Sequence, residues 1–173
     1  ILSTKENASQ MPHTIIGIDE WMKANRATVE GMLAAITDGG DQIKADPRAV
    51  SAAAAISAKV YHEYDASYWE RYFYGVTKRD ATGLEVELGG SAVNNLADNL
   101  YLFGLSGGTN LFEVTYLTFG KYLHRYHPDM LDVIQPVSEI LDTSYLAALA
   151  KRTKATTVAA TPQFAGARPV LSE

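Results

Sequence analysis

Residues 88–100 read Leu-Gly-Gly-Ser-Ala-Val-Asn-Asn-Leu-Ala-Asp-Asn-Leu and join a strand-like pattern to a run of helical patterns. Paired glycines allow a ligand to approach the backbone closely. A helix capped by Ser91 would expose first-turn N–H groups that suit an oxyanion. The apolar residues from Val93 to Phe103 keep helical spacing, so we expect this helix to end at Gly104.

The polar side of this predicted helix carries short side chains, at Asn94, Asn95, Asp98 and Asn99. These residues form helices less readily than the Glu and Lys that usually cover an exposed face. They suit fixed hydrogen bonds to a ligand, a lid or a neighbouring segment. The alternative is that Gly-Gly-Ser is only a turn and a cap, and that the amides bond to local backbone.

Three helices and a strand are predicted before this stretch. Helical spacing begins at Ile18, with Asp19 as its cap and Gly39-Gly40 as its stop. Asp46-Pro47 starts a second helix, whose small-residue face runs from Val50 to Tyr64. Asp65 caps a short third helix that closes at Gly75, and residues 84–88 alternate as a short strand or extended arm.

Two further helices are predicted after Gly104. Asn110 and Glu113 have capping-box spacing at the start of one, which His127-Pro128 ends. Asp142 caps the other, which runs to Arg152. The sequence therefore predicts a predominantly α fold of about six helices with short strands. We expect residues 1–154 to form the folded part and residues 155–173 to be a linker.

Composition narrows the function classes. Fifteen Lys and Arg against twenty Asp and Glu give a net charge of −5, so nucleic acid is an unfavourable partner. The chain has no Cys, which excludes disulfides, thiolate nucleophiles and Cys zinc sites. No apolar run approaches the roughly 20 residues that span a bilayer. No signal-peptide pattern is present, and both ends suggest a piece cut from a longer chain.

Other candidate site residues are aromatic or hydroxyl-bearing. Five aromatics crowd into residues 68–74, where helical spacing favours core positions for most and leaves Trp69 as a candidate ligand contact. Ser3 and Thr4 follow a short apolar strand, a position where α/β folds place ligands.

Catalytic and metal signatures are weak. His124 and His127 lie three residues apart, but a third metal ligand is not evident, so a role at the helix end is favoured over metal binding. The Gly-x-Ser-x-Gly pattern of serine hydrolases does not occur. We therefore expect neither a metal nor a cofactor.

Five segments resemble the later half of bacterial periplasmic solute-binding proteins of the nitrate, sulfonate and taurine class. Within that class they resemble phosphate-type substrate-binding proteins fused to an outer membrane protein A-like domain. The matching segments are residues 1–6, 20–30, 68–76, 88–99 and 140–146.

The resemblance implies that the parent is a two-lobed α/β protein of the type II periplasmic binding class, which grips a small solute at its hinge. It implies a periplasmic location, a membrane transporter permease as partner, and attachment of the parent to peptidoglycan. An oxyanion or a sulfonate is one candidate class of solute. If the binding site of the family is carried over to this chain, the resemblance implies ligand contacts at Ser3, Thr4, Gly90, Ser91 and Asn94.

Three functions are therefore compared. The favoured one is non-catalytic recognition of a solute, with Trp69 and Asp98 added to the contacts. The second is an enzyme that uses Asp98 or a histidine as acid or base. The third is a helical scaffold that docks on another domain, for which changes at Asn94 and Asn95 would disturb assembly.

Overall fold

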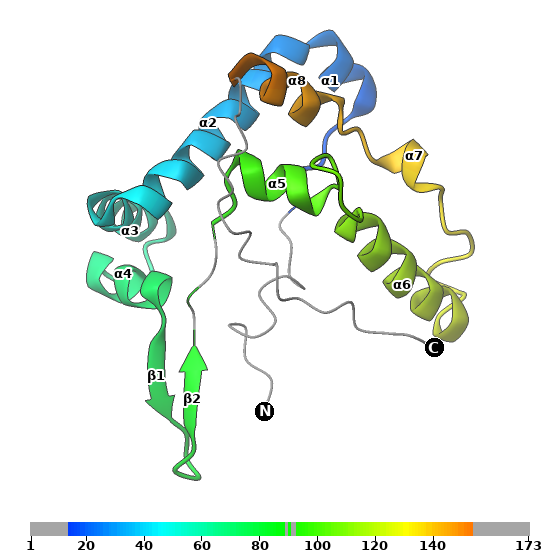
Figure 1. The fold of residues 1–173 in the computed structure, drawn as a ribbon. Coiled ribbons are helices and arrows are strands. Elements are labelled where there is room, and N and C mark those ends of the chain that lie inside the picture. The colour runs from blue at the N-terminus through cyan, green and yellow to red at the C-terminus, as the bar shows by residue number, and fades with distance from the viewer. Residues whose placement is uncertain (1–13, 89, 91–92, 154–173) are drawn as a thin grey trace. The chain divides into compact units, whose positions relative to one another are not determined.

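The computed structural model describes residues 14–88, 90 and 93–153, and most of these residues are helical (Figure 1). The predicted predominantly α class is therefore confirmed for this part of the chain. The elements are α1 (Asp19–Ala24), α2 (Arg26–Ala45), α3 (Pro47–Tyr61), α4 (Ala66–Tyr74), β1 (Val76–Arg79), β2 (Glu85–Leu88), α5 (Leu96–Leu102), α6 (Leu111–Tyr126), α7 (Val137–Ile140) and α8 (Ser144–Thr153).

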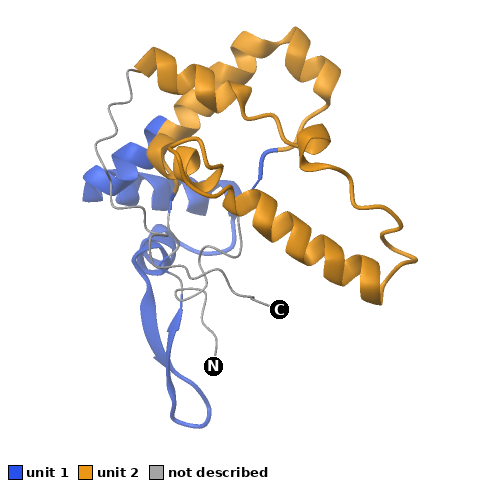
Figure 2. Cartoon of the chain, turned by 45° about the vertical axis from the view of Figure 1, so that its right-hand side comes forward, with its two compact units in different colours: residues 1–15, 38–93, 163–173 blue, residues 16–37, 94–162 orange. Residues whose placement is uncertain are grey.

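The chain divides into two compact units, drawn in different colours in Figure 2. The first comprises residues 1–15, 38–93 and 163–173, and the second comprises residues 16–37 and 94–162. The boundary between them falls within α2. The predicted linker, residues 155–173, lies outside the described residues.

In the first unit, α3 and α4 form a helical hairpin. Asp46 accepts a hydrogen bond from the Arg48 N–H, and Pro47 occupies the first helical turn, as predicted. The buried residues of α3 are Val50 and Ala54. The predicted small-residue face of this helix is only partly buried, because Val60 is exposed.

A β-hairpin follows α4 directly. Strands β1 and β2 are antiparallel, with Val76 opposite Leu88 and Arg79 opposite Glu85. The Asp80 carboxylate closes the turn by accepting hydrogen bonds from backbone N–H groups of Thr82 and Leu84. The predicted strand at 84–88 thus exists as β2, whereas its partner β1 was not predicted, because Val-Thr-Lys-Arg has no alternating pattern.

In the second unit, α5 packs against α8. The buried apolar residues of the second unit are Val29, Leu96, Leu102, Tyr145 and Leu149. Helix α6 begins at the predicted cap, where Asn110 Oδ1 accepts the Glu113 N–H at 3.1 Å, and it ends before His127-Pro128. Asp142 Oδ1 accepts the Ser144 N–H at 2.8 Å at the start of α8.

Two predicted boundaries near the N-terminal helices are wrong. Helix α1 ends at Ala24 and α2 begins at Arg26, and Ile18 rather than Asp19 occupies the N-cap position. Helix α2 also continues through Gly39-Gly40 to Ala45. Glycine lowers helix propensity by about 1 kcal/mol without forbidding the conformation. The flanking helical residues therefore override the expected stop.

A pair of glycine substitutions tests the backbone conformation. Gly104 has φ +72°, and a Cβ atom there would lie 3.0 Å from the Asn110 nitrogen and the Gly108 carbonyl oxygen. We expect Gly104→Ala to lower the free energy of unfolding by at least about 1–2 kcal/mol. Gly39→Ala has open space within α2 and should raise it by about 0.5–1 kcal/mol. Urea denaturation measures the free energy of unfolding of both variants. A similar change of the same sign in the two would contradict the described geometry.

Acid sensitivity is expected at the start of α4. The pKa of Asp65 is lowered by the hydrogen bond from the Tyr68 N–H and then by that from the Ser67 hydroxyl. This contribution to stability is present above the unfolded pKa of about 3.9 and is lost as pH falls through the lower folded pKa. Asp65→Asn keeps a capping oxygen, so its stability should fall less steeply below about pH 4. Chemical denaturation at stepped pH, with Glu63→Gln as control, checks this expectation, and parallel curves for wild type and Asp65→Asn would refute it.

Candidate functional site

Three tyrosine rings contact one another in sequence at the start of α4 and along it. Tyr68 and Tyr72 are four residues apart, which places them on one face of α4, and Tyr64 precedes the N-cap residue Asp65. The ring centroids of Tyr64 and Tyr68 are 3.9 Å apart, and those of Tyr68 and Tyr72 are 4.5 Å apart. We call these three residues the aromatic row. Their mutual contacts hold the rings in fixed positions on a partly exposed surface.

Trp69 packs beside the aromatic row. Its ring lies 5.2 Å from Tyr61 on α3, 5.8 Å from Tyr68 and 6.2 Å from Phe73, between ring centroids. The indole Nε1 atom is buried and has no hydrogen-bond partner among the described residues. Leaving a buried donor unpaired costs about 1–3 kcal/mol. Trp69 therefore holds a hydrogen-bond donor that an incoming acceptor could satisfy.

A positive charge lies at one end of the aromatic row. The ammonium nitrogen of Lys78 on β1 is 5.4 Å from the Tyr72 ring centroid, within the range of a cation–π contact. A hydrogen bond with Tyr72, and then electrostatic attraction to the Tyr72 oxygen, raise the pKa of Lys78 above its ordinary value. Ring surfaces next to a retained ammonium group provide chemistry that suits a small organic or inorganic anion.

Gly90 adjoins the end of α4. Its N–H donates to the Tyr72 carbonyl oxygen at 2.9 Å, and its backbone has φ +69°. A Cβ atom at Gly75, where φ is +93°, would lie 3.4 Å from the Gly90 backbone. The two glycines thus fix the hairpin base against α4 and bring Gly90 next to Tyr72, three residues from Trp69.

Asn95 and Asp98 have a local structural role at the start of α5. Helix α5 begins at Leu96 with Asn95 as its N-cap, so the prediction that Ser91 caps this helix is wrong. Asn95 Oδ1 accepts the Asp98 N–H at 3.0 Å, and Asp98 Oδ2 accepts the Asn95 N–H at 3.1 Å. The exposed fractions of Asn95 and Asp98 are 7% and 1%. This reciprocal capping box corresponds to the local-backbone alternative for the amides.

The predicted contacts fall into separate groups. Trp69 and Gly90 belong to the first unit, whereas Asn94, half-buried before α5, and Asp98 belong to the second. Ser3, Thr4 and Ser91 lie outside the described residues. Sequence reasoning grouped Trp69 with Tyr68 and Phe73, but it missed the contact of Trp69 with Tyr61 on α3. The four-residue spacing of Tyr68 and Tyr72 signals their ring contact, but Lys78 reaches Tyr72 only through the unpredicted strand β1.

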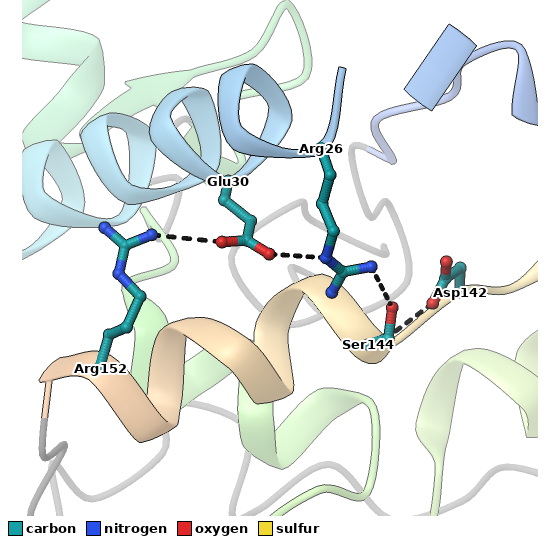
Figure 3. A network of polar contacts seen from close by, with 5 residues as sticks. All are labelled: Arg26, Glu30, Asp142, Ser144 and Arg152. Carbon is teal, nitrogen blue, oxygen red and sulfur yellow. Dashed lines mark hydrogen bonds and ion pairs between the residues drawn. The ribbon is translucent and has the colours of Figure 1, made fainter. Parts of the chain in front are cut away.

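A polar network joins α2 to α8 in the second unit (Figure 3). Glu30 bridges two guanidinium groups, with Oε1 2.8 Å from Arg26 Nε and Oε2 3.2 Å from Arg152 Nη1. Arg26 Nη1 also donates to Ser144 Oγ at 3.1 Å. Burial acts to raise the pKa of Asp142, but the hydrogen bonds from Ser144 outweigh it and the net shift is downward. Because these groups hydrogen-bond to one another, we interpret the network as a structural contact that holds α2 against α8.

Tyr145 lies beneath this network. The Arg26 guanidinium carbon is 4.4 Å from the Tyr145 ring centroid, and the buried Tyr145 hydroxyl has no hydrogen-bond partner among the described residues. The Arg26–Glu30 pair could have been found from its four-residue spacing. Its link to Arg152, 122 residues from Glu30 in the chain, could not.

His124 has a local contact on α6. Its Nδ1 atom lies 3.0 Å from the Leu131 carbonyl oxygen. Residues 14–88, 90 and 93–153 contain no group of three His, Cys, Asp or Glu that could hold a metal ion. Among the helices described, none is both long enough and apolar enough to cross a membrane.

Substitution of the adjacent residues Asn94 and Asn95 distinguishes helix capping from other roles of this segment. Asn95→Ala removes the capping oxygen of α5, so we expect the free energy of unfolding to fall by about 1–2 kcal/mol. Asn94→Ala, outside the helix, should change it by less than about 0.5 kcal/mol. Urea denaturation followed by circular dichroism compares the two variants. Equal losses would show that the capping box is not what stabilises this segment.

The chain was compared with known proteins in three ways. No family model, no curated protein and no solved structure matches it.

Proposed function

We propose that this chain is the later part of a two-lobed periplasmic solute-binding protein and recognises a small solute without transforming it. The observation that carries the proposal is the unpaired Trp69 Nε1 donor within a cluster of aromatic rings. The resemblance of residues 68–76 and 88–99 to such proteins supports it, because these segments contain Trp69, Tyr72 and Gly90.

The chemistry of the cluster is that of binding. Ring faces contact an apolar body, the indole N–H donates to an acceptor, and Lys78 attracts negative charge. An oxyanion or a sulfonate carries acceptor oxygens and the charge that Lys78 complements. A parent of this kind would deliver its solute to a transporter permease in the membrane and would attach to peptidoglycan through a further domain.

Binding at Trp69 is expected to move side chains. The Nε1 atom is covered, so a solute can reach it only in a conformation in which the surrounding rings have shifted. The solute would stabilise that conformation by the hydrogen bond it gains there. We therefore expect binding to change the environment of the Trp69 indole.

Fluorescence of Trp69 tests the proposal. The chain has two tryptophans, so Trp21→Phe leaves Trp69 as the only indole reporter. We expect a saturable change in its emission with at least one of phosphate, sulfate, nitrate, ethanesulfonate or a small carboxylate, matched by heat in calorimetry. The intact gene product that contains this sequence is titrated in the same way, because the solute site of a two-lobed parent includes both lobes. Absence of binding by that product to all five would overturn the proposal.

A matched pair of variants then locates the contact. Trp69→Phe keeps an aromatic ring and removes the N–H, so affinity for the identified solute should fall about fivefold to tenfold. Tyr74→Phe changes an exposed ring on the same helix and should leave affinity unchanged. Equal affinity of wild type and Trp69→Phe would remove Trp69 from the site while leaving solute binding itself intact.

A further inference from the structure

Helix α6 carries an exposed aromatic face that the proposed function does not use. Phe119, Tyr122 and Tyr126 follow one another at three- and four-residue steps, which places them on one side of the helix. Their exposed fractions are 62%, 47% and 61%. The rings of Tyr122 and Tyr126 stack at 6.2 Å between centroids. We call these three residues the α6 stripe.

Contacts with the following segment lie on a different face of the helix. Tyr116, Gly120 and His124 recur every four residues, and each contacts residues 131–135. The Tyr116 hydroxyl donates to the Gln135 carbonyl oxygen at 3.1 Å, and a Cβ atom at Gly120 would lie 3.3 Å from Ile134. The α6 stripe is therefore separate from the face that packs on this segment.

Positive charge accompanies the stripe. Residues 119–126 include Lys121 and Arg125 and no acidic residue, whereas the whole chain has a net charge of −5. The Arg125 guanidinium carbon lies 5.4 Å from the Tyr126 ring centroid. The nearest acids that follow lie beyond the end of α6, Asp129 before the segment that contacts the other face and Asp132 within it. Arg125 thus places a positive charge directly beside the stripe, in a chain whose net charge is negative.

We propose that the α6 stripe binds the surface of an anionic lipid bilayer. Tyrosine and phenylalanine rings partition into the headgroup region, where the hydroxyl stays hydrated and the ring contacts lipid. Lys121 and Arg125 pair with lipid phosphates, and each basic residue near an anionic surface adds to the attraction. A convex row of rings needs no matching groove on such a surface. The contact is peripheral and brings the chain to the membrane without crossing it.

Vesicle co-sedimentation of the full chain tests this inference. We expect binding to vesicles of phosphatidylcholine mixed with phosphatidylglycerol, weaker binding to phosphatidylcholine alone, and release by added salt. Tyr122→Ser should weaken binding about tenfold, the equivalent of one buried ring. Tyr74→Ser, which removes a ring of similar exposure (58%) from α4, is the matched control and should bind as wild type does.

A charge variant keeps the test independent of folding. Arg125→Gln alters an exposed side chain and should reduce both the affinity for anionic vesicles and its salt dependence. Circular dichroism checks that each variant folds. Absence of vesicle binding, or equal binding by wild type, Tyr122→Ser and Arg125→Gln, would overturn the proposal. A change in oligomeric state for Tyr122→Ser without vesicle binding would assign the face to a protein contact and would also overturn it.

Discussion

Hydrogen bonds from side-chain oxygens to free backbone N–H groups define the helix starts on which this structure depends. Such contacts begin five of the helices, at Asp46, Asp65, Asn95, Asn110 and Asp142. Fully buried apolar residues are few in the described part of the chain. Because apolar burial normally supplies most of the stability of a domain, a small core gives each local cap greater weight.

This dependence on local contacts explains which parts of the fold could be predicted. Asp46, Asp65, Asn110 and Asp142 were recognised because a cap and its N–H partner lie within a few residues of each other. The start of α5 was misplaced because Ser91 and Asn95 both suit an N-cap, and the reciprocal bond to Asp98 decides between them. Strand β1 depends on cross-strand pairing with β2, which its own four residues do not signal.

The contacts of the candidate site also divide into local ones, which the sequence signals, and tertiary ones, which it does not. Trp69 was recognisable from the local density of aromatic residues, and its neighbours Tyr68 and Phe73 lie within one helical turn. Lys78 and Gly90 reach the same helix through the hairpin, so their contacts with Tyr72 follow from tertiary structure. The link between Glu30 and Arg152 depends on the packing of α2 with α8, and no spacing rule could have supplied it.

The diglycine within α2 has a consequence for cooperativity. Gly39 and Gly40 follow directly after Thr37 and Asp38, where the division between the two compact units falls. Glycines raise the entropy gained when a helix opens, so the hydrogen bonds accepted by their carbonyls should break most often in sub-global fluctuations. Amide protons in the last turns of α2 would then exchange with solvent sooner than those near Val29, and one unit could melt while the other stays folded.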